Sequence, residues 1–88
     1  MTSYQNRLIN MTHQQDDTGC WIWNGQISNS GYGRVMELQH DRSTKMVSAQ
    51  MASYHAFVGT VPDGHLVKQR CGNRLCINPE HLELLAVD

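Results

Sequence analysis

The sequence predicts a single small α+β domain, and three observations lead to this fold class. The chain has 88 residues, which is room for one compact core. Short segments rich in aromatic and branched side chains indicate strands, and one longer segment has the apolar spacing of a helix. A chain of this length buries only a thin core, so we expect an additional cross-link to hold it together.

The first half of the chain contains a polar segment followed by two expected strands. Residues 1–18 are predicted to be a polar N-terminal segment with a short helix around Leu8, and residues 19–88 the domain itself. A first strand is expected over 20–23, where two tryptophans alternate so that one should face the core. A second strand is expected over 34–38, followed by a turn.

The second half contains the predicted helix. Ser48 is a suitable N-cap, and Gly59 should end the helix. A short strand should begin at Leu66, and one helical turn is expected over 80–85. The helix prediction depends on apolar residues at helical spacing, which we expect to face the core: Val47, Met51, Tyr54, Phe57 and Val58.

Charge and hydropathy exclude several classes of protein. Seven Lys and Arg against eight Asp and Glu give a formal net charge of −1, which argues against a strongly basic nucleic-acid coat protein. No apolar run approaches the ~20 residues of a membrane span. The N-terminus lacks the pattern of a secretion signal, so we expect a cytoplasmic, intracellular protein with no membrane contact.

The cysteines are the best candidates for the cross-link. Their number is odd, which argues against a framework of disulfides. Four residues separate Cys71 from Cys76, and four more separate Cys76 from His81. Three thiolates and one imidazole suit a tetrahedral zinc ion, and Cys20 could complete the set from a distant strand. The sequence therefore predicts a structural zinc site that ties the two halves together. The alternative is that the cysteines are buried free thiols and His81 is a surface or capping residue.

The order of these motifs resembles small phage-type HNH endonucleases, which are related to the His-Cys box enzymes. The most specific part of the resemblance is the final block, CGNRLCINPEHL over 71–82, which follows GCWIW over 19–23 and GYGR over 31–34. The resemblance covers about residues 19–85 and implies a zinc-stapled ββα-metal (His-Me finger, HNH-like) fold with short antiparallel strands and one or two helices. It also implies the same four zinc ligands.

The catalytic positions of that family are altered in this sequence. The resemblance implies a general-base histidine two residues before Cys71, where this chain has Gln69. A neutral amide cannot accept a proton near pH 7. The His-Arg pair that the family has near the start of its helix corresponds to Gln50 and Met51. The family's asparagine ligand for catalytic Mg²⁺ would fall about nine residues after His81, beyond the end of this sequence.

Other residues are candidates to replace the missing base or to contact a partner. His40, His55 and His65 are expected to be ordinary surface histidines, and Asp88 is a terminal residue. Four cations are candidates for binding phosphates or an acidic partner, and the last three of them cluster within seven residues at the cysteine loop: Arg34, Lys68, Arg70 and Arg74.

Three functions remain open from the sequence. The first is a catalytically inactive HNH-like protein that binds DNA or a protein partner, as a phage regulator or inhibitor would. The second is an active Mg²⁺-dependent DNA endonuclease or nickase with a rearranged site. The third is a zinc-stabilised interaction module that does not contact nucleic acid.

Overall fold

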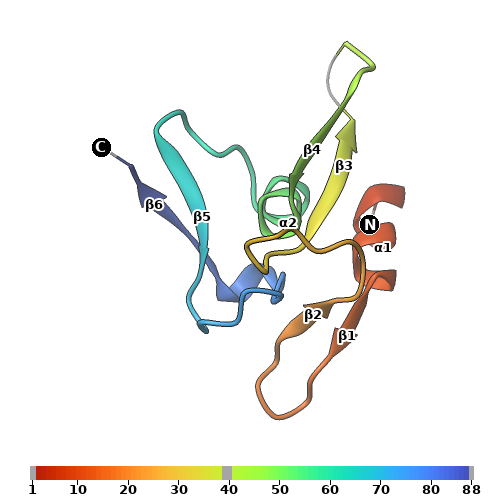
Figure 1. The fold of residues 1–88 in the computed structure, drawn as a ribbon, viewed down its shortest axis with the longest axis vertical. Helices are drawn as coiled ribbons and strands as arrows, with labels where there is room; N and C mark the ends of the chain where they lie inside the picture. Colours follow the sequence, from red (N-terminus) through yellow and green to blue (C-terminus); the bar gives the residue numbers. More distant parts are fainter. Residues whose placement is uncertain (1, 39–40, 88) are drawn as a thin grey trace.

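The computed structural model describes residues 2–38 and 41–87, and within them three antiparallel ribbons surround a central helix (Figure 1). This confirms the small α+β class. The histidine at position 40 and Asp88 lie outside the described residues. The elements are the helices α1 (Ser3–Asn10) and α2 (Ala49–Phe57), the 3-10 helix η1 (Pro79–His81), and the strands β1 (Thr12–Gln14), β2 (Trp21–Trp23), β3 (Arg34–Leu38), β4 (Thr44–Ser48), β5 (His65–Gln69) and β6 (Leu82–Ala86).

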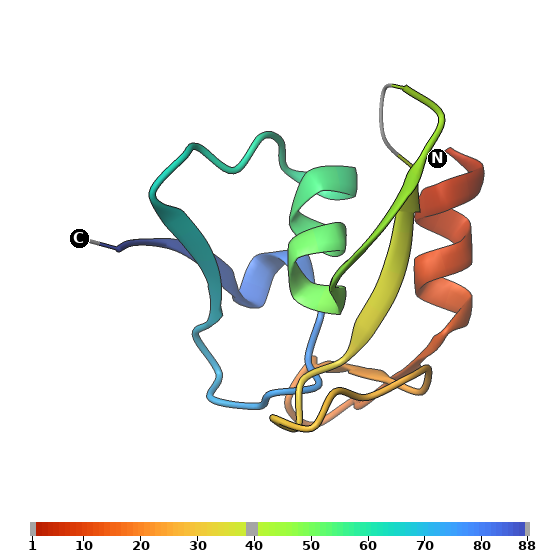
Figure 2. The ribbon, with the colours of Figure 1, turned by 45° about the horizontal axis from the view of Figure 1, so that its top comes forward.

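Each ribbon pairs two strands that are neighbours in the chain. The pairs are β1 with β2, β3 with β4, and β5 with β6. Helix α2 lies between the β3–β4 and β5–β6 ribbons, and α1 lies on the far side of β3–β4 (Figure 2). None of the helices in the described part of the chain has the length and apolarity needed to cross a membrane.

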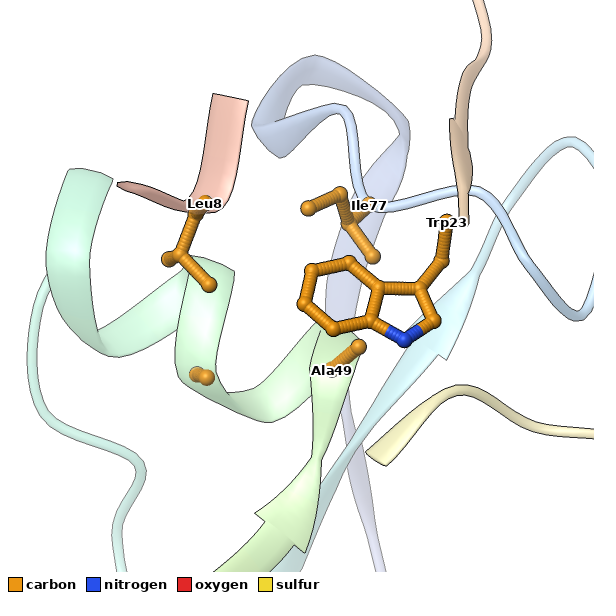
Figure 3. Close-up of a cluster of buried hydrophobic side chains, with 5 residues drawn as sticks. Leu8, Trp23, Ala49 and Ile77 are labelled. Atoms are coloured by element: carbon orange, nitrogen blue, oxygen red, sulfur yellow. The ribbon is translucent and has the colours of Figure 1, made fainter. Parts of the chain in front are cut away.

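The hydrophobic core lies where α1, β2, α2 and the cysteine loop meet. Its large members are Leu8 of α1, Trp23 of β2 and Ile77, each no more than 2% exposed, and the side chains converge in Figure 3. Ala49 and Ala52 of α2 complete the cluster. As expected from the alternation in β2, only one of its two tryptophans is fully buried.

The N-terminal helix is well anchored to this core. The hydroxyl of Thr2 accepts the backbone N–H of Gln5, and the Gln5 side chain accepts the N–H of Thr2, which forms a capping box. The same Gln5 side chain donates to the backbone oxygen of Ala56 at 2.6 Å. Polar residues thus start α1 and hold it against α2, while Leu8 enters the core.

Helix α2 differs from the predicted helix in its start and in its buried face. Ser48 does cap it, since its hydroxyl accepts the backbone N–H of Met51, but Val47 belongs to strand β4. The residues it buries are small or polar: Ala49, Gln50, Ala52 and Ser53. The expected apolar face was therefore right only in part. Val47 and Phe57 pack against the core, but Met51 and Tyr54 are not among its members and Val58 is exposed, because α2 approaches its neighbours closely through Ala49 and Ala52. The Ser53 hydroxyl donates to the Ile77 oxygen at 2.6 Å.

The C-terminal segment is also not the helical turn that was expected over 80–85. A single 3-10 turn ends at His81, and Leu82–Ala86 then pairs with β5 as strand β6. The extended conformation is more stable here because strand β5 supplies backbone hydrogen-bond partners along its length. A short isolated helix would lack such partners. This pairing aligns Gln69 with Leu82, close to the end of the cysteine loop.

Candidate metal centre

Four potential metal ligands gather at one point of the structure. The donor atoms of Cys20, Cys71, Cys76 and His81 all lie within 4.8 Å of one another. Cys20 and Cys76 are buried, His81 is partly buried and Cys71 is exposed. They are the four residues that the cysteine spacing predicted, so the fold brings Cys20 to the C-terminal loop.

Three of the distances between these atoms are close to the edges of a tetrahedral zinc site. With Zn–S near 2.3 Å and Zn–N near 2.0–2.1 Å, the tetrahedron has S–S edges of about 3.8 Å and S–N edges of about 3.5 Å. The Cys20 Sγ lies 3.6 Å from the Cys71 Sγ and 3.6 Å from the His81 Nδ1. The Cys76 Sγ lies 3.4 Å from the same Nδ1. The residues therefore fit a zinc ion, which would bind to Nδ1 of the histidine.

Backbone pairing between β2 and the cysteine loop places Cys20 at the site. The backbone N–H of Trp23 donates to the oxygen of Leu75 at 2.8 Å, and that of Ile77 donates to the oxygen of Trp21 at 2.9 Å. The two bonds flank an antiparallel bridge between Ile22 and Cys76. A strand from the N-terminal half thus runs along the loop, and the residue before it, Cys20, reaches the other ligands.

Asn78 holds both sides of the site. Its side-chain Nδ2 donates to the backbone oxygen of Gly19 at 2.6 Å, next to Cys20. Its Oδ1 accepts the backbone N–H of Glu80 at 3.0 Å and so caps η1, which carries His81. This one buried amide therefore orients ligands that come from opposite ends of the chain.

Replacing Asn78 should weaken the site. We expect Asn78→Ala to lower the free energy of unfolding by about 2 kcal/mol, because two hydrogen bonds of a buried amide are lost. Asn78→Asp is the matched control, since it keeps the acceptor for Glu80 but loses the donor to Gly19. Urea unfolding in excess zinc would measure both. A loss in the Asp variant as small as ~0.3 kcal/mol would show that the bond to Gly19 does not matter.

The thiols differ in their acidity. Burial raises the pKa of Cys76 to about 12. Burial also acts on Cys71, but a backbone hydrogen bond from Asn73 and the neighbouring thiols outweigh it and lower the pKa of that thiol. A divalent cation would hold all three cysteines as thiolates and release their protons, so affinity for it should fall as the pH is lowered.

Gln69, at the expected general-base position, lies inside the protein. Its side chain is 7% exposed, and its Nε2 donates to the backbone oxygen of Arg74 at 3.2 Å. Its own backbone oxygen accepts the N–H of Gly72 at 3.2 Å. Gln69 is thus bonded to the cysteine loop through both its side chain and its backbone, and helps to hold the loop in place.

The four candidate cations occupy two different places. Lys68 on β5 and Arg70, the first residue after it, are exposed and lie either side of buried Gln69. The side chain of Arg74 instead contacts the loop before β3. Its Nη1 donates to the Ser30 oxygen at 3.0 Å, and its guanidinium lies 5.5 Å from the centre of the Tyr32 ring. Arg34 begins β3, which follows the same loop.

The remaining histidines are away from the metal ligands. His55 on α2 pairs through Nδ1 with a Glu37 carboxylate oxygen at 2.9 Å, and His65 begins β5, where its Nδ1 lies 3.1 Å from the backbone oxygen of Asp63. Sequence reasoning missed the roles of Asn78 and Ser53. The pattern Asn-Pro before η1 could have indicated the cap, whereas no sequence signal indicates the partner of Ser53.

Fold and site together define a small α+β protein with antiparallel ribbons and a Cys₃His centre able to hold zinc, consistent with the ββα HNH fold. Residues 49–87, from the start of α2 to beyond β6, match the family model of HNH endonucleases. This part of the chain is thus similar to HNH endonucleases.

One relative is similar to the chain over a longer stretch than the family model. The chain is 37% identical over 67 residues to Protein 2.8 of Escherichia phage T7. The aligned part makes up 76% of this chain but 42% of the relative, so the chain spans less than half of that protein's length. No solved structure matches the chain significantly.

Proposed function

We propose that this protein is an HNH-like module, held together by structural zinc, that binds DNA without cutting it. The observation that carries the proposal is that Gln69, at the position of the expected base, is a buried neutral amide. An HNH nuclease needs a base that accepts a proton from the attacking water. Here the corresponding side chain is a neutral amide, buried and engaged with the backbone of Arg74. It supports the loop and has no capacity for base catalysis.

The surface near this position supports contact with nucleic acid. Lys68, on β5, and Arg70, just after its end, are both exposed and flank the buried Gln69 in the chain. Exposed cations of this kind bind backbone phosphates and release counterions, even when the net charge is slightly negative. Such a protein would occupy DNA that an active nuclease of the same fold would cut. It would act as a regulator or inhibitor inside a phage-infected cell.

A plasmid assay tests the catalytic part of this proposal. We expect no nicking of supercoiled plasmid by the purified protein with Mg²⁺ or Mn²⁺, because no base activates the water. Gln69→His should be assayed in parallel, since it restores the residue that the family resemblance implies. Catalytic turnover by the unmodified protein would overturn the proposal and support an active Mg²⁺-dependent nuclease with a rearranged site.

A gel shift tests DNA binding. We expect a shift at low salt that weakens steeply as salt is added. Arg70→Gln should weaken binding to all sequences alike and reduce the salt slope by about one. Glu83→Gln, which changes an exposed residue on the neighbouring strand, is the control and should not weaken binding. If no shift appears at low salt, the protein is an interaction module without nucleic-acid contact.

A further inference from the structure

The last strand of the structure, β6, is an edge strand. Its main contact is with β5, and in the described part of the chain no other strand pairs with it. In Figure 1 the C-terminal end of β6 projects from the body of the molecule. Proteins commonly protect such an edge with lysine, proline or a β-bulge, because its unpaired backbone groups can bind another strand. The β6 sequence, LELLA, has neither lysine nor proline, and its register with β5 runs without a bulge.

The backbone bonds of the β5–β6 ribbon show which groups of β6 are open. The N–H of Val87 donates to the Gly64 oxygen at 2.7 Å. In an antiparallel ladder alternate residues bond to the partner strand, so Leu85 also bonds to β5, whereas Leu84 and Ala86 direct their backbone groups to the other side. In the described part of the chain, no backbone bond outside the ladder involves either of these two residues. We call their two N–H and two C=O groups the open edge.

Two copies of the open edge fit each other in an antiparallel register. Leu82, the preceding residue of the same orientation, is not part of it, because its N–H already donates to the Pro79 oxygen. A twofold axis can place Leu84 of one copy opposite Ala86 of a second copy, and the reverse. This register satisfies every group of the open edge with four backbone hydrogen bonds. Leu85 then lies at the axis, opposite Leu85 of the second copy.

The side chains favour a second copy over an unrelated strand. Leu85 and Leu66 are cross-strand neighbours, and both are exposed. In the twofold register the exposed leucines of the two copies form one continuous row across four strands. Glu83, the acidic residue of β6, lies opposite exposed Val87 of the second copy, and the two Glu83 positions are about 14 Å apart along the strands. The register thus joins apolar surface to apolar surface and places no like charges opposite each other.

We propose that two copies of this protein associate through the open edge of β6 and form a four-stranded antiparallel sheet in the order β5–β6–β6–β5. This dimer goes beyond the DNA binding proposed above and does not depend on it. The contact consists of two short edge strands, so it is smaller than the interface of a stable dimer. We expect a dissociation constant of about 0.1 mM, so that dilute solutions contain the monomer.

Sedimentation equilibrium of the zinc-saturated protein tests the association. Between about 10 µM and about 1 mM, we expect the average mass to rise from that of a monomer toward that of a dimer. Ala86→Pro removes an N–H of the open edge but no bond to β5, and should weaken the dimer about tenfold to hundredfold. Ala86→Ser keeps the N–H and should dimerise like the unmodified protein. A protein that stays monomeric at about 1 mM would overturn the proposal and leave the open edge for a strand of another protein.

A second variant keeps the test valid if the proline variant fails to fold. Leu85→Glu places two carboxylates opposite each other at the twofold axis, and should weaken the dimer at least about tenfold. Leu38→Glu, the same change at an exposed leucine of β3, is the matched control and should leave the dimer intact. If Leu85→Glu dimerises as well as the control, the contact uses another surface and the proposal is wrong.

NMR spectroscopy locates the contact. The backbone amides of Leu84 and Ala86 donate hydrogen bonds only in the dimer, so their signals should shift and their exchange with solvent should slow as the concentration is raised. The amide of Leu85 bonds to β5 in the monomer, and its exchange should change much less. A dimer in which the amides of Leu84 and Ala86 exchange as fast as in the monomer would contradict the proposed pairing.

Discussion

Removing the metal should unfold this protein. Among the described residues, the fully buried core cluster consists of three large side chains, Leu8, Trp23 and Ile77, and two alanines. Structural zinc in small domains supplies an apparent ~10–16 kcal/mol, as much as the whole stability of a typical domain, which is about 5–15 kcal/mol. The four candidate metal ligands also join Cys20 to a loop some fifty residues later in the chain. Without the ion, these two distant segments would lose their main link.

Metal analysis and circular dichroism would measure this effect. We expect about one zinc per chain, loss of structure with a strong chelator, and recovery when zinc is added back. His81→Asn should have the same effect as the chelator, whereas His13→Asn, on exposed β1, should not. A protein that keeps its fold and its cooperative unfolding after complete metal removal would refute the structural role of zinc.

Leu8→Ala should cost about 2–5 kcal/mol in the free energy of unfolding. Leu8 is 1% exposed and contacts the core formed by β2, α2 and the cysteine loop, so its truncation leaves a cavity beside Trp23. This large effect is unexpected for a residue of the polar segment 1–18. We expect it because α1 covers one side of a small core, which would be exposed to solvent if the helix did not pack there.

Urea unfolding at saturating zinc would give the cost of Leu8→Ala. The matched control is Leu85→Ala, the same change at a leucine that is 46% exposed, for which we expect less than ~1 kcal/mol. Equal costs for the two variants would mean that α1 frays from the domain in solution. In that case residues 19–88 would form the stable unit by themselves.

The ligand set of the metal site could be predicted because coordination chemistry acts at short range in the chain. Cys71, Cys76 and His81 lie within one loop, and the preference of zinc for thiolate and imidazole makes their spacing informative. Strand β2 was predicted because its aromatic and branched residues fit a pleated, half-buried surface. The cap at Ser48 was predicted because it involves neighbours in sequence alone.

Other features depend on partners that are distant in the chain, and local pattern could not indicate them. The buried face of α2 consists of small residues because of what packs against it, and a helical period does not contain that information. Strand β6 was mistaken for a helical turn because its ladder partners lie in β5. The same holds for Arg74, whose guanidinium leaves the cysteine loop for Ser30 and Tyr32.

By itself, the sequence determined the small α+β class, the four zinc-ligand candidates and the presence of Gln69 where the family resemblance implies a general base. These follow from residue types and short spacings, which are local properties. Only the tertiary structure decided that Nδ1 of His81 faces the thiols and that Gln69 is buried against the cysteine loop. Each of these features depends on which distant segments pack against one another, and the packing of the whole chain determines that.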